Sequence, residues 1–201
     1  MYNPGLKFRY LLHRIAANNR HGIHSPFVYR LVDNVIYDFR AKNAYSELKK
    51  LYSTPANDPR FTLPQKVMEL LYRIGADFKP LSIVMTPAVS TAVAKCLQLS
   101  APGAKIYRLN AHEQPQNIKA DLIYIEAEPG KDALALFNQC MPYVTTGTML
   151  VLQNVHQSRQ GKQAWAAIKA HPRVTVTIDL FWLQLVYFRE GQAREDFRIK
   201  Y

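Results

Sequence analysis

The stretch "KPLSIVMTPAVSTAVAKCLQL", residues 79 to 99, reads as a short buried strand that turns directly into a helix. In open sheets that bind a nucleotide-like cofactor, such a turn normally contains glycine, because glycine adopts positive φ and lets a ligand approach the backbone. The turn in this chain, "MTPAVS", contains no glycine. The sequence therefore predicts the frame of a cofactor-binding sheet with an unusual turn at its centre.

The segments that follow this stretch predict a parallel sheet. Short apolar runs occupy 81–85, 104–109, 121–127 and 148–154, and helical patterns lie at about 88–99, 131–141 and 159–170. Such alternation is typical of parallel strands covered on both faces. The next stretch, "RVTVTIDLFWLQLVYFREG", holds two strands joined by too few residues for a parallel crossover. We therefore expect an α/β, Rossmann-like sheet with a C-terminal antiparallel pair. The tail "DFRIKY" either follows the surface or adds an edge.

The first 78 residues predict helices. Amphipathic patterns lie at 5–19, 25–38, 43–52 and 63–78, and Ser25 and Pro26 are the expected cap and first residue of the second helix. The whole chain has 201 residues, of which 48% are hydrophobic, so it can bury one sizeable core. We expect one domain, 1–201, in which a helical extension, 1–78, packs on a Rossmann-like core, 79–201.

The net charge is +11, and most of the basic excess lies in the first 120 residues. This bias favours an anionic partner, and nucleic acid bound by the basic N-terminal half is one alternative. The N-terminus is unlike a signal peptide and no apolar run is long enough to span a bilayer, so we expect a cytoplasmic protein without a membrane partner. Cys96 and Cys140 lie among apolar residues of predicted helices, with no CxxC motif, and are interpreted as core residues.

Two segments carry a family resemblance: "HGIHSPFVYRLVDNVIYD", residues 21–38, and "AWAAIKAHPRVTVTIDLFWLQLVYFREGQAREDFRIKY", residues 164–201. With the order of strands, they resemble a family of class I S-adenosylmethionine-dependent methyltransferases common in Bacteroidetes. The resemblance implies a Rossmann-like sheet with an antiparallel seventh strand. It also implies that the methionine and carboxylate of the cofactor lie over the first strand's turn, and that an acidic residue after the second strand holds the ribose.

The chain departs from this family pattern at each of these places. Thr86 and Pro87 are interpreted as the cap and first residue of the helix after the first strand, so that this helix start satisfies its own N–H groups. Asn110 stands where the family has an acid. Only ten residues, 111–120, connect the second and third predicted strands, too few for the helix and strand that help frame the adenine, so we expect about six strands.

The candidate cofactor-binding residues are Thr86, Ser90, Asn110 and Glu126. The catalytic candidates are His156 and Glu126. His156 lies just past a strand's carboxyl end, and histidine is the residue type best suited to proton transfer near neutrality, although His156 could instead fix the loop into the following helix. Glu126 could act as a base, bind a hydroxyl, or be a solvated carboxylate.

No metal site is expected, because Gln153 and Asn154 replace strand-end acids that a hard cation needs. A zinc site made of His21, His24 and His156 is a minor alternative.

These observations favour a methyltransferase-like protein whose S-adenosylmethionine site is lost or weakened. Such a pseudoenzyme would act as a non-catalytic partner of another protein or of a second copy of itself. The alternatives are an active methyltransferase that holds the cofactor by non-standard contacts and modifies a small molecule, and the nucleic-acid-binding protein considered above.

Overall fold

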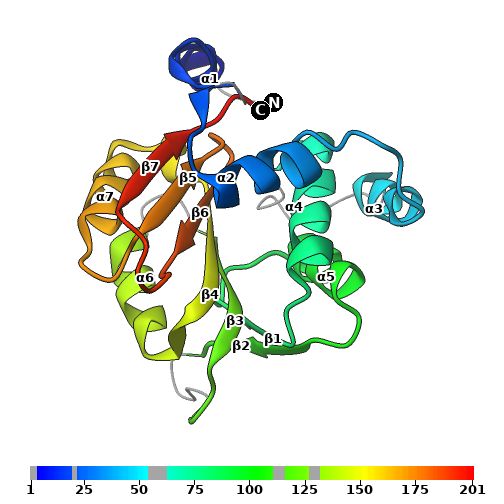
Figure 1. Cartoon of the computed structure of the whole chain (residues 1–201). Helices are drawn as coiled ribbons and strands as arrows, with labels where there is room; N and C mark the ends of the chain where they lie inside the picture. The colour runs from blue at the N-terminus through cyan, green and yellow to red at the C-terminus, as the bar shows by residue number, and fades with distance from the viewer. Residues whose placement is uncertain (1–3, 20–21, 54–62, 111–115, 127–131) are drawn as a thin grey trace.

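The computed structural model describes residues 4–19, 22–53, 63–110, 116–126 and 132–201. Its centre is a seven-stranded sheet with the order β2-β1-β3-β4-β6-β5-β7 (Figure 1). The strands are β1 (Ser82–Met85), β2 (Lys105–Arg108), β3 (Ala120–Glu126), β4 (Val144–Gln153), β5 (Val176–Asp179), β6 (Leu183–Tyr187) and β7 (Glu195–Arg198). Strands β2, β1, β3 and β4 are parallel, whereas β6 is antiparallel to both β4 and β5. The predicted parallel sheet with an antiparallel pair is confirmed.

The predicted number of about six strands is wrong, because the tail adds an edge strand. Strand β7 pairs in parallel with β5, and Asn18 forms a further parallel bridge with Ile199 just beyond it. At the opposite edge lies β2, whose one neighbour among the described residues is β1. The described part of the short connection, 116–119, contains neither helix nor strand. Among the described residues, the sheet thus has no strand beyond β2 and one further strand, β7, beyond β5.

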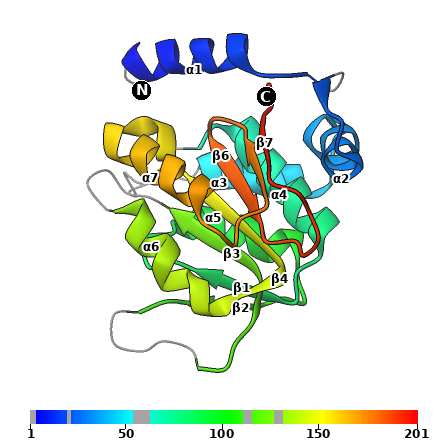
Figure 2. The same ribbon diagram turned by 60° about the vertical axis from the view of Figure 1, so that its left-hand side comes forward.

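Helices cover both faces of the sheet, as the buried apolar runs predicted. Helices α4 (Gln65–Phe78) and α5 (Thr91–Ser100) cover one face, and α6 (Ala133–Cys140) and α7 (Arg159–Ala170) cover the other (Figures 1 and 2). Alternate residues of β3 enter different hydrophobic clusters: Leu122 and Tyr124 pack on the α4–α5 side, whereas Ile123 and Ile125 pack on the α6–α7 side. This alternation lets each side chain be assigned to a face.

The N-terminal segment forms α1 (Pro4–Ala16), α2 (Pro26–Leu31) and α3 (Ala44–Ser53). The helix predicted at 25–38 is α-helical only to Leu31 and continues as a π-helix, η2 (Val32–Ile36). Pro26 is its first residue as predicted, but the Ser25 side chain makes no capping hydrogen bond. Buried residues of α2, η2 and α4 share one hydrophobic cluster with the sheet.

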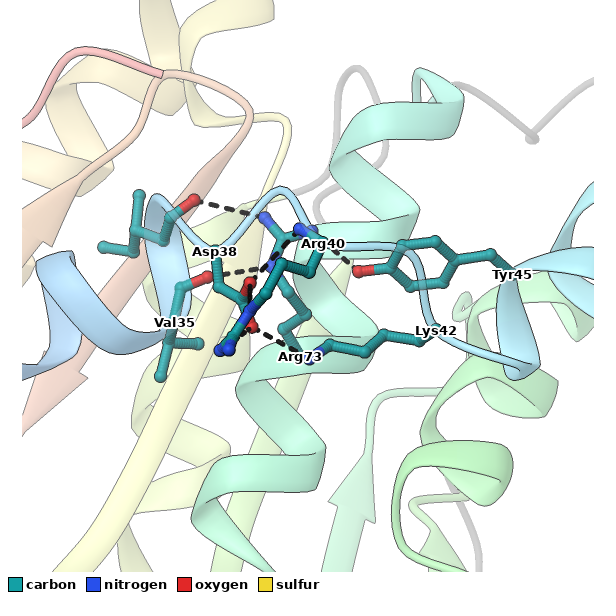
Figure 3. A network of polar contacts seen from close by, with 7 residues as sticks. Val35, Asp38, Arg40, Lys42, Tyr45 and Arg73 are labelled. Atoms are coloured by element: carbon teal, nitrogen blue, oxygen red, sulfur yellow. Dashed lines mark hydrogen bonds and ion pairs between the residues drawn. The ribbon is translucent and has the colours of Figure 1, made fainter.

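A buried arginine fixes the end of η2 (Figure 3). Arg73 of α4, 5% exposed, donates from Nε to the Val35 carbonyl at 2.8 Å and from Nη2 to the Ile36 carbonyl at 3.1 Å. Its Nη1 donates to the Tyr45 hydroxyl of α3 at 2.9 Å. One guanidinium therefore joins η2, α3 and α4, and it satisfies carbonyl groups that the helix end leaves without intrahelical partners.

Beside this arginine, Asp38 accepts hydrogen bonds from Arg40 and Lys42 at 2.6 and 2.9 Å (Figure 3). These bonds hold the pKa of the Asp38 carboxyl well below its usual value.

Helix α1 lies outside the layers that cover the sheet (Figure 2). Its Leu6 and His13 side chains are buried against the rest of the chain. The opposite side is apolar and exposed, with exposed fractions of 61% for Phe8, 53% for Leu11 and 73% for Ile15. Among the described helices, none has both the length and the apolar character that a bilayer-spanning segment requires.

Candidate functional site

Three of the four predicted cofactor-binding residues meet at the carboxyl ends of the parallel strands. Thr86 follows β1, Glu126 ends β3, and Ser90 precedes α5. The Ser90 amide donates to Glu126 Oε2 at 3.0 Å, and the Glu126 amide donates to Thr86 Oγ1 at 3.3 Å. The fourth residue, Asn110, is exposed two positions after the end of β2. Residues 86–90, called the first turn below, are therefore joined to the end of β3.

The predicted start of the helix after β1 is wrong by one turn. Helix α5 begins at Thr91, and Ser90 is its cap, accepting from the Val93 amide at 3.4 Å. Thr86 and Val89 instead close a β-turn, in which the Val89 amide donates to the Thr86 carbonyl at 3.2 Å. Pro87 fits the second position of such a turn as well as the first position of a helix, which explains the error.

Buried polar groups surround Glu126, which is itself only 2% exposed. The Gln153 amide nitrogen donates to Glu126 Oε1 at 3.2 Å, and the Tyr124 hydroxyl donates to Gln153 Oε1. The interpretation of Glu126 as a solvated strand-end carboxylate is therefore wrong. Gln153 thus supplies a hydrogen-bond donor to this carboxylate.

Arg108 of β2 holds the first turn from its other side. Its Nη1 donates to the carbonyls of Pro87 and Val89 at 3.0 and 2.7 Å. Hydrogen bonds from the chain's own residues thus fix both the amide that opens α5 and two carbonyls of the turn.

A second polar centre lies at the same end of the sheet, where the parallel strands finish. His156 lies in the short helix η4 (Val155–Gln157), and its Nε2 is 2.9 Å from each carboxylate oxygen of Asp179, the last residue of β5. His13 of α1 approaches the same carboxylate, with 3.4 Å between Nε2 and Oδ1. His13, His156 and Asp179 are called the histidine–aspartate cluster below.

The hairpin between β5 and β6 holds this cluster in place. The Phe181 amide donates to Asp179 Oδ1 at 2.9 Å, and the Gln184 side chain donates to the same oxygen at 3.2 Å. Phe181 has a φ of +71°, a conformation that is rare for a bulky residue. Its ring stacks on His156, with centroids 5.0 Å apart, and meets the His13 ring edge-on at 5.5 Å.

Burial acts to raise the pKa of the Asp179 carboxyl, but the contacts with His13 and His156 outweigh burial and hold that pKa well below its usual value. The carboxylate is therefore ionised at neutral pH.

The cluster lines a cleft of about 810 Å³ between α1, α7, β5 and β7. Its walls carry four basic side chains, Arg9, Lys162, Lys169 and Arg198, and one further acid, Asp196. Lys169 and Asp196 form an ion pair at 3.4 Å. The cleft is therefore basic and suits an anionic ligand.

The two centres belong to opposite faces of the sheet. Glu126 follows the alternation of Tyr124, which packs toward α4 and α5. Ile178 also packs on that side, so its neighbour Asp179 points to the other side, where α7 lines the cleft. The structure thus separates His156 from the predicted cofactor residues.

Comparison with solved structures shows which known proteins share this fold. No family model matches the sequence, and a search of curated proteins finds no match. The SAH-bound methyltransferase PaMTH1 from Podospora anserina superposes with a TM-score of 0.57 at 11% identity, covering 84% of this chain and 97% of that one. An O-methyltransferase from Bacillus cereus in complex with SAH gives 0.53 at 15% identity, covering 80% and 97%. The chain has a class I methyltransferase-like fold.

Within this methyltransferase-like fold, sequence reasoning missed His13 and Asp179. Asp179 ends the apolar run "RVTVTID", and a polar residue at that position is the same signal that singled out Glu126. His13 gave a weaker signal, because it lies on the buried side of α1 among residues that read as an ordinary amphipathic helix. In the zinc alternative, His24 is exposed away from His156, and His21 lies outside the described residues.

Proposed function

We propose that this methyltransferase-like protein has a lost or weakened S-adenosylmethionine site and serves as a non-catalytic partner of another protein. The observation that carries the proposal is the hydrogen bond between Glu126 and the Ser90 amide, 3.0 Å long. In the family that the sequence resembles, the cofactor's own carboxylate lies over this turn. Here a carboxylate of the protein already binds the amide that opens α5.

The expected loss of cofactor affinity follows from the repulsion between the Glu126 carboxylate and the carboxylate of the cofactor. Two carboxylates about 4 Å apart repel each other by about 4 kcal/mol at an effective dielectric constant of about 20. Since each 1.4 kcal/mol changes a dissociation constant about tenfold, this repulsion weakens a micromolar site to about the millimolar range. Asn110 adds to the loss, because an amide bound to a ribose lacks the charge-assisted strength of a carboxylate.

Isothermal titration calorimetry with S-adenosylmethionine and with its demethylated product tests the cofactor part of the proposal. We expect a dissociation constant weaker than about 1 mM for the unmodified chain. Glu126→Gln keeps the shape and an acceptor for Ser90 but removes the charge, so it should tighten binding up to about a thousandfold. Glu69→Gln, on the surface of α4, is the matched control and should change nothing. Low-micromolar binding by the unmodified chain would overturn the proposal in favour of an active methyltransferase with non-standard contacts.

The exposed side of α1 supports the partner role. Phe8, Leu11, Leu12 and Ile15 follow the i, i+3, i+4, i+7 spacing of a helix face that packs into a groove, and each is about half exposed or more. The described part of α1 carries basic residues and no acid. A second copy would bring like charges together, so the surface suits an acidic protein with an apolar groove.

Sedimentation equilibrium tests this choice of partner. We expect a monomer over the micromolar range, because two basic helices repel each other. A dimer that Leu11→Ser with Ile15→Ser dissociates would instead assign the α1 surface to self-association and contradict the acidic partner.

A further inference from the structure

The histidine–aspartate cluster brings three metal-ligating side chains together from distant parts of the sequence. His13 comes from α1, His156 from η4 and Asp179 from the end of β5, and one ligand atom from each lies within 4.8 Å of the other two. The cluster lies apart from the first turn, so its chemistry is independent of the proposed loss of the cofactor site.

We propose that His13, His156 and Asp179 bind a Zn²⁺ ion. Two imidazoles and one carboxylate form a ligand set that zinc accepts readily, whereas magnesium and calcium prefer oxygen ligands alone. This ligand set also differs from the strand-end carboxylates of the family pattern. Their replacement by Gln153 and Asn154 is the reason why the sequence predicts no metal site. The protein would therefore hold a borderline-soft cation on the opposite face of the sheet from Glu126.

Two of the three ligand–ligand distances are close to those around a tetrahedral ion, and the two histidine nitrogens lie within 4.8 Å of each other. With bonds of about 2.0–2.2 Å, the ligand atoms around zinc lie roughly 3.3–3.5 Å apart. His13 Nε2 and Asp179 Oδ1 are already 3.4 Å apart. His156 Nε2 lies 2.9 Å from the carboxylate, the distance of a hydrogen bond, and the ring would move away by about half an ångström as the ion replaces the shared proton.

His13 provides a second, independent observation. Its side chain is 5% exposed, and neither ring nitrogen forms a hydrogen bond of good geometry among the described residues: Nε2 has only its 3.4 Å contact with Asp179. Buried polar groups almost always have such a partner, and an unpaired one costs about 1–3 kcal/mol. A metal ion bound to Nε2 would satisfy that nitrogen.

The surroundings of the cluster would orient the ligands. The Phe181 amide and the Gln184 side chain both donate to Asp179 Oδ1, as supporting hydrogen bonds do around bound metals, and so fix the orientation of the carboxylate. The Phe181 ring restrains both imidazoles.

Three protein ligands leave one coordination position for water or an anionic oxygen. The basic cleft beside the cluster, with Lys162 and Arg198 in its walls, is suited to supply an anionic ligand to that position.

Zinc titration of chelator-treated full-length protein tests the proposal. Calorimetry and elemental analysis after dialysis should give one Zn²⁺ per chain. His13→Gln and His156→Gln, on two different elements, should each weaken zinc binding at least about 100-fold, since even supporting residues change metal affinity by about 10–100-fold. His24→Gln, an exposed histidine outside the cluster, is the matched control and should bind zinc unchanged. Circular dichroism confirms that each variant is folded.

Cobalt provides an independent readout of the ligand set. Co²⁺ added in place of zinc should give the intense visible absorption of a tetrahedral site, and this absorption should disappear in His156→Gln. The proposal is overturned if the unmodified protein binds no zinc, or if zinc binds equally well to both cluster variants, because the ion would then lie elsewhere.

Discussion

Arg73 allows the most direct test of how the helical segment is held together. We consider Arg73→Met, which keeps the length and the apolar stem of the side chain but removes the guanidinium. In the native protein this group donates to the carbonyls of Val35 and Ile36 and to the hydroxyl of Tyr45. Methionine can replace none of these donors.

The expected loss of stability follows from the buried carbonyls that would lose their donor. A buried carbonyl without a partner costs about 1–3 kcal/mol, so the two carbonyls at the end of η2 together cost about 2–6 kcal/mol. The variant recovers part of this, because it no longer buries a charge. We therefore expect the free energy of unfolding to fall by about 3 kcal/mol. For a chain of this length, this corresponds to a decrease in Tm of about 6–12 °C.

Chemical denaturation followed by circular dichroism measures the free energy directly. Arg40→Met is the matched control, because Arg40 belongs to the neighbouring ion pairs but its side chain is 81% exposed. That substitution should leave the free energy of unfolding nearly unchanged, because exposed ion pairs contribute little. If Arg73→Met costs less than about 1 kcal/mol, the carbonyls of η2 do not depend on the guanidinium, and the reasoning is refuted.

Two further predictions concern packing and thiol chemistry. A Cβ at Gly161 would lie 2.4 Å from the Val155 carbonyl oxygen, so Gly161→Ala should displace η4 and lower the free energy of unfolding by about 1–3 kcal/mol, whereas Gly103→Ala, with nothing within 4 Å, should be neutral in the same denaturation assay. Burial raises the pKa of the Cys140 thiol to about 12 and that of Cys96 further, so iodoacetamide at about pH 8 should label neither in the native state, and mass spectrometry that finds either one modified would contradict their burial.

The centre of the sheet was predictable because the strands inside it are buried on both faces. Each parallel strand reads as an apolar run, and the short connection after β5 allows only an antiparallel partner. The edge strand β7 was harder to predict, because its burial alternates and its sequence, "EDFR", is mostly charged. An edge strand needs only one pairing partner, so its residues need not be apolar.

The residues of the candidate site were predictable only in part, because only some of them follow strands that the sequence pattern shows. Thr86, Ser90 and Glu126 follow the ends of recognisable strands, and parallel topology brings strand ends together. The contact of His13 with Asp179 spans nearly the whole chain and depends on where α1 docks, which no local pattern encodes. Whether the chain belongs to the Bacteroidetes type of the family stays a prediction.

The docking of α1 also limits the order in which parts of the protein can fold during synthesis. His13 emerges from the ribosome before the hairpin that carries Asp179 and before the segment at Ile199 that bridges to Asn18. During translation, α1 therefore cannot dock, and its histidine cannot meet Asp179, until these later segments have been made. A nascent chain stalled before residue 179 would contain strands β1 to β4 but would lack β6, β7 and Asp179, so it would have no place to hold an ion.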